Sequence, residues 1–239
     1  IEFKTKTIFG DYTWVEARIF CAQVMGIKKL LFYIYDISDR KTISSLVKEK
    51  EEILDALKAY KGKNIKRICI QSMASEEAHN SVLDFINYIS GKIDMPISLS
   101  AKLENDEQIK KFFSAGVNKI GIAIDAANKE LYEKIKGINY DEKLKFITEM
   151  SKSYPNKIST HIIVGMGESH EDIYNLYTYL KENDVTISLF AFTPVRGTKM
   201  EKISQPSIES YRRVQLMSYM INKGYPKEYF KFKNGYLNS

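Results

Sequence analysis

The sequence predicts an α/β protein built on a parallel sheet, and two patterns in its 239 residues support this. Short runs rich in Ile, Val, Phe and Tyr alternate along the chain with longer amphipathic stretches. Several of the short runs are apolar almost throughout, as expected for parallel strands that are buried on both faces. Strand–helix alternation with short loops favours right-handed crossovers. The six repeats fit an open doubly wound sheet or a partial TIM barrel, (βα)6.

The strands come from six apolar runs, and the helices come from the stretches between them. The predicted strands cover residues 30–36, 65–72, 96–101, 119–125, 157–165 and 186–193. The predicted helices cover residues 46–60, 76–90, 104–115, 128–136, 141–153, 170–183 and 207–223. Gly116 and Gly137 are candidate C-caps, and Pro206-Ser207 is a helix-start signal. A further, N-terminal helix is expected over about residues 11–25.

We expect a single domain, because no linker rich in Gly, Pro or Ser interrupts the chain and its composition does not shift. Residues 1–29 are then an N-terminal extension, residues 30–222 the barrel and residues 223–239 a C-terminal tail. In either architecture ligands gather at the C-terminal ends of the parallel strands. A functional site is therefore expected at that edge.

The composition argues against several classes of protein. Shares of 44% hydrophobic and 12% aromatic residues are typical of soluble globular proteins, and no apolar run approaches a membrane span of roughly 18 residues. The start shows no signal-peptide pattern, and Cys21 and Cys69 lie far apart, so we expect a cytoplasmic protein without a disulfide framework. The charge of +6 comes largely from lysines scattered among glutamates, which disfavours a nucleic-acid partner.

The predicted strand ends carry small, polar and turn-forming residues. These residues are Gln71, Ser72, Ser98, Ser100, Lys102, Asp125, Gly165, Gly167, Glu168, Thr193 and Pro194. Each also has a purely structural interpretation. Asp125 is placed to cap the following helix, and Glu168-Ser169 reads as a helix start with Asp172 returning a capping bond. Several such residues around one rim nevertheless favour a ligand site.

The three histidines do not suggest a metal site. His161 alternates with apolar neighbours in a strand, which favours a core or barrel-lining role over metal ligation. His79 and His170 fall in or at helices and are expected at the surface. No HExxH, CxxC, P-loop or GxSxG pattern occurs, so hydrolytic zinc, phosphate-loop and serine-nucleophile chemistries lack their minimum parts. No metal ligand is predicted among these residues.

The order of several segments resembles one known family. The runs SAGVNKIGIAIDAANKELYEKIKG, THIIVGMGESHEDIYNLYTYLKEN and FAFTPVRGT look like the radical S-adenosylmethionine (SAM) superfamily, and most like its biotin synthase and lipoyl synthase branch. KRICIQS, MPISLSAKL and EARIFCAQVMG match that branch as well, so the resemblance covers roughly residues 12–222. It implies a partial TIM barrel of six βα units, with SAM as a cofactor.

The resemblance also implies roles for the strand ends. In the family the second strand's end contacts the methionyl amino group, the third and fourth ends approach the ribose and carboxylate, and the fifth and sixth ends lie against the adenine. The second strand's end corresponds here to Gln71 and Ser72, and the third and fourth ends correspond to Ser98, Ser100, Lys102 and Asp125. The fifth and sixth ends correspond to Val164, Gly165, Phe192, Thr193 and Pro194. Gly165 suits its position because a backbone without Cβ lets a ring approach closely.

The chain departs from the family at the iron–sulfur cluster. Family members carry three cysteines, usually CxxxCxxC, after the first strand, and their thiolates hold a [4Fe–4S] cluster. The segment 37–45, which follows the first predicted strand, contains no cysteine. Two explanations remain open. Either the cluster loop is missing from this sequence, or the protein is a relative that has lost it.

Three functional hypotheses follow. The first is an enzyme that forms a 5′-deoxyadenosyl radical for cofactor biosynthesis, by sulfur insertion or a related C–H functionalisation, with an electron donor such as ferredoxin or flavodoxin. Its substrate is a small molecule or protein-bound, and Arg196 and His161 are the candidate substrate contacts. The second is a cluster-less barrel that binds a nucleotide or supports a partner. The third is an ordinary barrel enzyme using Asp125, His161 and Glu168 as acid–base groups.

Overall fold

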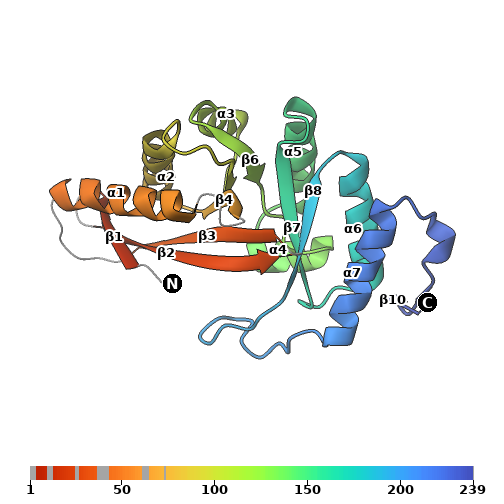
Figure 1. Cartoon of the computed structure of the whole chain (residues 1–239). Helices are drawn as coiled ribbons and strands as arrows, with labels where there is room; N and C mark the ends of the chain where they lie inside the picture. The colour runs from red at the N-terminus through yellow and green to blue at the C-terminus, as the bar shows by residue number, and fades with distance from the viewer. Residues whose placement is uncertain are drawn as a thin grey trace. The chain divides into compact units, whose positions relative to one another are not determined.

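A computed structural model describes the chain at residues 4–9, 13–24, 27–36, 43–60, 65–72 and 74–238 (Figure 1). Side chains are described at residues 50–59, 66–72 and 74–238. The chain divides into two compact units, unit 1 at residues 1–121 and unit 2 at residues 122–239. The prediction of a single domain stays a prediction.

Unit 1 contains a sheet of six strands in the order β1-β2-β3-β4-β5-β6. Its elements are β1 (Lys4–Phe9), β2 (Thr13–Val24), β3 (Ile27–Asp36), α1 (Ile43–Tyr60), β4 (Ile65–Gln71), α2 (Glu76–Ile89), β5 (Ile97–Ser100), α3 (Asp106–Ser114) and β6 (Val117–Gly121). Strands β1, β2 and β3 pair antiparallel, whereas β3, β4, β5 and β6 pair parallel. The predicted parallel strands of this unit are therefore present.

The N-terminal helix predicted over residues 11–25 is wrong, because residues Thr13–Val24 form strand β2. Apolar residues recur there at every second position, from Val15 to Cys21, and this is the period of a strand rather than a helix. β-branched and aromatic residues also favour extended backbone. The register from Val15↔Asp36 to Val24↔Ile27 pairs most of the strand with β3.

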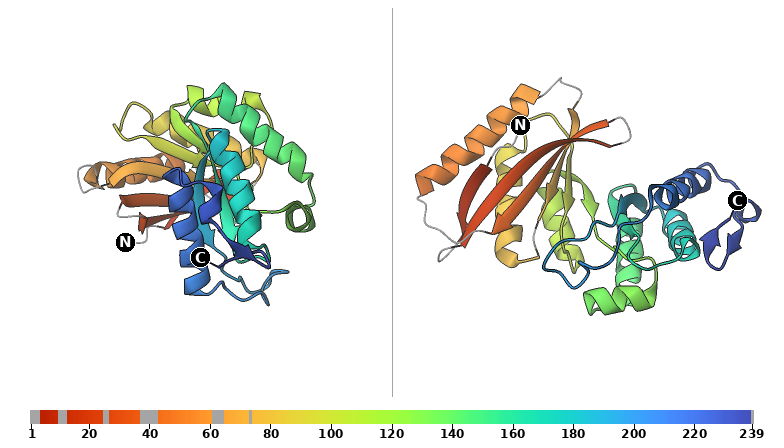
Figure 2. Two further views of the ribbon diagram at one scale, coloured as in Figure 1. Left: turned by 90° about the vertical axis from the view of Figure 1, so that its right-hand side faces the viewer. Right: turned by 90° about the horizontal axis from the view of Figure 1, so that it is seen from below.

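Unit 2 continues the strand–helix alternation and ends in a small hairpin. Its elements are α4 (Lys129–Lys136), α5 (Tyr140–Ser153), β7 (Ile158–Val164), α6 (His170–Glu182), β8 (Thr186–Ala191), α7 (Ile208–Asn222), the 3-10 turn η1 (Lys227–Tyr229), β9 (Phe232–Lys233) and β10 (Tyr236–Leu237). Strand β7 pairs parallel with β8 from Ser159↔Thr186 to Val164↔Ala191. Helices α6 and α7 lie side by side in both views of Figure 2, and the Asn222 amide donates to the Tyr177 hydroxyl across them (2.8 Å).

Local sequence signals explain where these helices begin and end. Ser169 caps α6 and Asp172 returns the bond, so the capping box predicted from the sequence is confirmed. Gly137 ends α4 with φ of 67°, a left-handed conformation that glycine adopts at little cost. None of the described helices is long and apolar enough to cross a membrane.

His170 is buried, so the expectation that it lies at the surface is wrong. The Leu237 N–H donates to His170 Nδ1 (3.2 Å), which leaves Nε2 protonated and able to donate to the Ser210 hydroxyl (2.8 Å). The ring also packs edge-on against Tyr236, with 5.2 Å between centroids. His170 thereby attaches the C-terminal hairpin β9–β10 to the start of α6. No local sequence pattern predicts this tertiary contact.

Candidate functional site

In unit 1 the sheet register brings four predicted site residues together. Gln71 of β4 pairs with Ser100 of β5, and the Ser72 N–H donates to the Ser100 carbonyl (2.9 Å). Ser98 lies one row further from the strand ends and accepts a hydrogen bond from Arg67 Nη1 (2.9 Å). All four predicted residues are half-buried, so a ligand can reach their polar groups.

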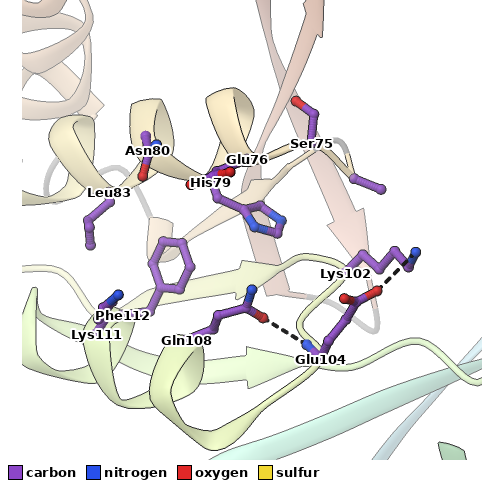
Figure 3. A pocket seen from close by; sticks show the side chains of 11 residues that line it. Ser75, Glu76, His79, Asn80, Leu83, Lys102, Glu104, Gln108, Lys111 and Phe112 are labelled. Atoms are coloured by element: carbon purple, nitrogen blue, oxygen red, sulfur yellow. Dashed lines mark hydrogen bonds and ion pairs between the residues drawn. The ribbon is translucent and has the colours of Figure 1, made fainter.

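Lys102 follows the same strand end but lies at the edge of a pocket that these four residues do not line. Its exposed side chain forms an ion pair with Glu104 (3.1 Å). Both residues border a pocket of about 340 Å³ formed by α2, the β5–α3 loop and α3, which is drawn in Figure 3. Lys102 therefore follows Ser100 by two positions in the sequence but belongs to the rim of this pocket.

This pocket has an apolar floor and a charged rim. Phe112 lies edge-on to His79, with 6.3 Å between ring centroids, and the His79 Nε2 atom is buried with no hydrogen-bond partner among the described residues. Burial lowers the pKa of His79, against the opposing charges of Glu104 and Glu76. His79 is half-buried rather than at the surface, so that expectation from the sequence is corrected as well.

In unit 2 the buried carboxylate of Asp125 contacts His161 and Lys136. The exposed fraction of Asp125 is 6%, its Oδ1 lies 2.6 Å from His161 Nε2, and its Oδ2 forms an ion pair with Lys136. Burial alone would raise the pKa of Asp125, but the hydrogen bonds and charges of His161 and Lys136 outweigh burial and lower it. The carboxylate is therefore ionised at neutral pH.

The backbone at Asp125 is held in an unusual conformation. Its φ is 60°, in the left-handed region that residues other than glycine visit rarely, although Asp is among the more tolerant. The Asp125 N–H donates to the His161 carbonyl (3.0 Å), and the Ile163 N–H donates to the Asp125 carbonyl (2.8 Å). The N-cap role that was the structural interpretation of Asp125 is wrong, because Asn128 caps α4. Strained backbone at a charged strand end is common at functional sites.

At the end of β7 the loop Gly165-Met166-Gly167-Glu168 folds back on itself. Glu168 Oε1 accepts from the Gly165 N–H (2.5 Å), and Oε2 accepts from the Met166 N–H (2.9 Å). Burial raises the pKa of Glu168, and the hydrogen bonds from Gly165 and the rest of the loop oppose it. Ser169, not Glu168, caps α6, so Glu168 fixes the loop rather than the helix.

The glycine at position 165 is required by packing within the unit. Its φ is 101°, and a Cβ built there would lie 2.7 Å from Cδ of Pro206. The pyrrolidine ring thus occupies the side of Gly165 that a side chain would fill. The predicted adenine contact at Gly165 stays a prediction, and Pro206 already accounts for the glycine.

The end of β8 combines a buried and an exposed part. The Phe192 N–H donates to the Val164 carbonyl (2.8 Å), and both side chains are buried. Thr193 is exposed, and Pro194 is half-buried. Arg196 is exposed to solvent in the loop after β8.

Sequence reasoning missed three cations near these residues. Lys136 joins Asp125 from the far end of α4, and no local signal links the two. Arg67 and Lys119 lie on the same half-buried face as the predicted serines, and the period of two along each strand was a signal that could have found them. Among the residues with described side chains, no group of three His, Cys, Asp or Glu is placed to hold a metal ion.

The fold and these strand ends define a class of protein: an α/β chain whose parallel strands carry polar, ligand-sized groups at their carboxyl ends. The chain belongs to the radical SAM superfamily, whose family model matches residues 19–180.

Two solved structures share its fold. Methylornithine synthase PylB aligns with 77% of the chain at a TM-score of 0.57 and 19% identity, over 54% of its own length. The hydrogenase maturase HydG aligns with 79% of the chain at 0.58 and 11% identity, over 44% of its length. The predicted partial-barrel fold is thus confirmed.

Three curated relatives are similar to the chain over part of their length. It is 32% identical to biotin synthase of Methanococcus aeolicus over 158 residues, which cover 64% of this chain and 47% of that protein. It is 26% identical to GTP 3′,8-cyclase of Limosilactobacillus fermentum over 121 residues, which cover 50% of this chain and 37% of that protein. An uncharacterized protein of Methanocaldococcus jannaschii matches at 26%, over 63% of this chain and 41% of its own length. The chain thus spans about half or less of these relatives.

The residues present do not fit the family's iron–sulfur cluster. Three thiolates are needed, and the chain contains two cysteines, at register positions on β2 and β4. Positions 37–42, where the sequence placed the missing loop, lie outside the described residues.

Proposed function

We propose that this chain supplies the barrel of a radical SAM enzyme of cofactor biosynthesis, which forms a 5′-deoxyadenosyl radical for sulfur insertion or a related C–H functionalisation. The observation that carries the proposal is the family match over residues 19–180. The biotin synthase relatives support the cofactor-building part. In this proposal the cluster thiolates come from a loop that is not in the printed sequence, and ferredoxin or flavodoxin supplies the electron.

The strand ends are suited to hold the nucleotide in this proposal. Gln71, Ser72 and Ser100 offer half-buried donors and acceptors for the methionyl end. Asp125 remains able to accept a ribose hydroxyl, because a carboxylate has about four acceptor sites and two partners occupy it here. Glu168 keeps the β7 loop in one conformation, so the backbone expected to face the adenine is preorganised.

The test is the full-length native gene and its product. Three additional cysteines around Arg40 to Thr42 are expected in the gene. After anaerobic reconstitution with iron and sulfide, the product should show the visible absorbance of a [4Fe–4S] cluster and release 5′-deoxyadenosine from SAM upon reduction. An unbroken Arg40-Lys41-Thr42 sequence together with no bound iron would reject the proposal.

A second candidate function is a cluster-less subunit that binds a nucleotide or supports a catalytic partner. Its specific support is that segment 37–45, which follows the first parallel strand, contains no cysteine in the printed sequence. This candidate expects the full-length product to bind S-adenosylmethionine saturably while taking up no iron on reconstitution. Iron uptake by that product would reject it.

A further inference from the structure

His161 lies on the accessible face of β7, whereas its neighbours along the strand lie on the buried face. Thr160 and Ile162 have exposed fractions of 2% and 0%. The Thr160 hydroxyl accepts from the Ile124 N–H (3.1 Å) and donates to the Ile122 carbonyl (2.7 Å), so it is bonded within the unit. The His161 side chain is 23% exposed. Because side chains alternate along a strand, the imidazole points away from the buried face and can meet a ligand.

Asp125 fixes the position of His161. The Asp125 N–H donates to the His161 carbonyl (3.0 Å), and the Ile163 N–H donates to the Asp125 carbonyl (2.8 Å). The side chains meet as well, because Asp125 Oδ1 lies 2.6 Å from His161 Nε2. Backbone and side chain together hold the ring in one orientation. A group held in this way loses little further freedom when a ligand binds to it.

The same contact decides which ring nitrogen of His161 carries the proton. Burial would raise the pKa of Asp125, but His161 and Lys136 lower it, and the carboxylate is ionised at neutral pH. An ionised carboxylate only accepts hydrogen bonds, so Nε2 is the donor. In the neutral imidazole Nδ1 then carries the lone pair. Among the described residues none bonds to Nδ1, so this acceptor is left for a ligand.

An aromatic surface lies beside the imidazole. The ring of Phe190 on β8 meets the ring of His161 edge-on, with 5.4 Å between centroids and an angle of 90°. Phe190 has an exposed fraction of 49%. Ser188, the register partner of His161 on β8, is exposed as well. An exposed phenyl ring next to an open acceptor suits a ligand with an apolar body and one hydrogen-bond donor.

The charges around His161 favour a donor without charge. Lys136 forms an ion pair with Asp125, so the carboxylate beside the ring is already balanced. An ammonium group on the ligand would be repelled by the Lys136 cation. A carboxylate has no proton to donate to Nδ1. A hydroxyl group donates a hydrogen bond and brings no charge, so the ligand class that fits best is an alcohol.

We infer that His161 Nδ1 accepts a hydrogen bond from a hydroxyl group of the substrate, whose apolar part lies against Phe190. The word substrate rests on the proposed function, in which the ribose also lies at Asp125, so the hydroxyl would bind beside the nucleotide. The alcohol site itself rests only on unit 2. A chain that binds alcohols here but never cleaves SAM keeps the site and loses the enzyme. The reverse result keeps the enzyme and loses the site.

The first experiment determines the tautomer of His161 by NMR on the purified chain with isotope-labelled histidine. The chain contains three histidines, and His161→Gln identifies the His161 signals by their loss. The proton is expected on Nε2. Asp125→Asn is the comparison, because an amide can donate as well as accept and should admit the other tautomer. A proton on Nδ1 in the parent chain would overturn the inference.

The second experiment titrates the same labelled chain, without SAM or iron, with cyclohexanol and with cyclohexanone. The two probes have the same ring size, but only the alcohol donates a hydrogen bond. Cyclohexanol should shift the His161 ring signals saturably, and cyclohexanone should bind about tenfold more weakly or not at all. This difference separates an acceptor for the ligand from a histidine that only supports the fold.

Phe190 has its own substitution and control. Phe190→Ala should weaken cyclohexanol binding several-fold, because the apolar contact is lost. Tyr179→Ala is the matched control, because Tyr179 is an exposed aromatic residue of α6 in the same unit. It should bind as the parent does. Equal binding of alcohol and ketone, no saturable shift with cyclohexanol, or equal weakening in both variants would overturn the assignment and leave His161 as a structural partner of Asp125.

Discussion

The polar groups at the strand ends differ between the two units in how they are satisfied. In unit 2 the carboxylates of Asp125 and Glu168 are buried, with exposed fractions of 6% and 7%, and are bonded to groups of their own unit. In unit 1 Gln71, Ser98 and Ser100 are half-buried and follow the sheet register. The difference shows that unit 2 holds its loops in preset conformations, whereas unit 1 keeps polar atoms within reach of a ligand. Substitutions can test both halves of this contrast.

The largest effect is expected from Glu168→Ala. It removes the acceptor from two backbone N–H groups, those of Gly165 and Met166, and Met166 is itself buried. Leaving such donors without partners should lower the free energy of unfolding by about 3 kcal/mol. Urea unfolding measures this, with Glu171→Ala as the control, because Glu171 is exposed in the next turn. Equal losses in both variants would mean that Glu168 does not fix the loop.

Gly165→Ala should have the next largest effect. The new Cβ would lie 2.7 Å from Pro206 Cδ at a φ of 101°. The matched control is Gly197→Ala, where φ is 84° and no atom lies within 4 Å of the added Cβ. We expect a loss of about 1 kcal/mol at Gly197 from backbone strain alone, and about 2 kcal/mol at Gly165 from strain plus the contact.

The Pro206 contact can be separated from the strain at Gly165. Replacing Pro206 by Ala in the Gly165→Ala background should return part of the lost stability, as a double-mutant cycle would show. Additive losses would mean that the ring does not press on position 165. The excess at Gly165 over Gly197 would then need another cause.

Asp125→Asn tests the contacts of Asp125 with His161 and Lys136 in unit 2. The pKa of Asp125 is lowered in the folded chain, so its stabilisation is present above the ordinary value of 3.8 and is lost as the pH falls through the folded value. We expect the substitution to cost about 2 kcal/mol at pH 7 and to flatten the acid limb of the stability curve. Unfolding free energies measured at neutral pH and below 3.8 check both. If the loss of stability at acid pH is unchanged in the variant, that loss comes from other carboxylates.

Much of this architecture follows from local sequence, because strands and helix ends are set by neighbouring residues. The six predicted strands appear as β3 to β8, and the Ser169–Asp172 capping box and the Gly137 cap are where turn chemistry puts them. Residues 13–24 show the limit of resemblance. Their period of two predicts a strand, and the likeness to a family helix led to the wrong element.

The candidate site was predicted as positions but not as contacts. Polar strand ends can be found from the pattern, because each follows a run of apolar residues. The partner of Asp125 on α4, the fold-back of Glu168 and the ring of Pro206 over Gly165 join residues that only the folded chain brings together. Composition and periodicity do not predict which distant residues come into contact. Which groups are already satisfied, and which remain open to a ligand, therefore had to come from the structure.

The smallest expected change in stability comes from replacing His79 in unit 1, and this replacement should stabilise the chain. The Nε2 atom of His79 is buried without a partner among the described residues, beside the apolar Phe112 and Leu83. His79→Leu removes that cost and should raise the free energy of unfolding by about 1 kcal/mol at pH 7. Asn80→Leu, at the exposed edge of the same pocket, should bring no gain.

The pH dependence gives His79 a second, independent readout. Because its pKa is lowered from 6.5 by burial, the folded chain loses stability as the pH falls below 6.5 and through the folded value. His79→Leu should reduce this loss, which unfolding curves at neutral and mildly acidic pH would show. A variant that loses stability at pH 7 would mean that Nε2 has a partner after all. His79 of unit 1 would then resemble Asp125 and Glu168 of unit 2, whose polar atoms are bonded within their own unit.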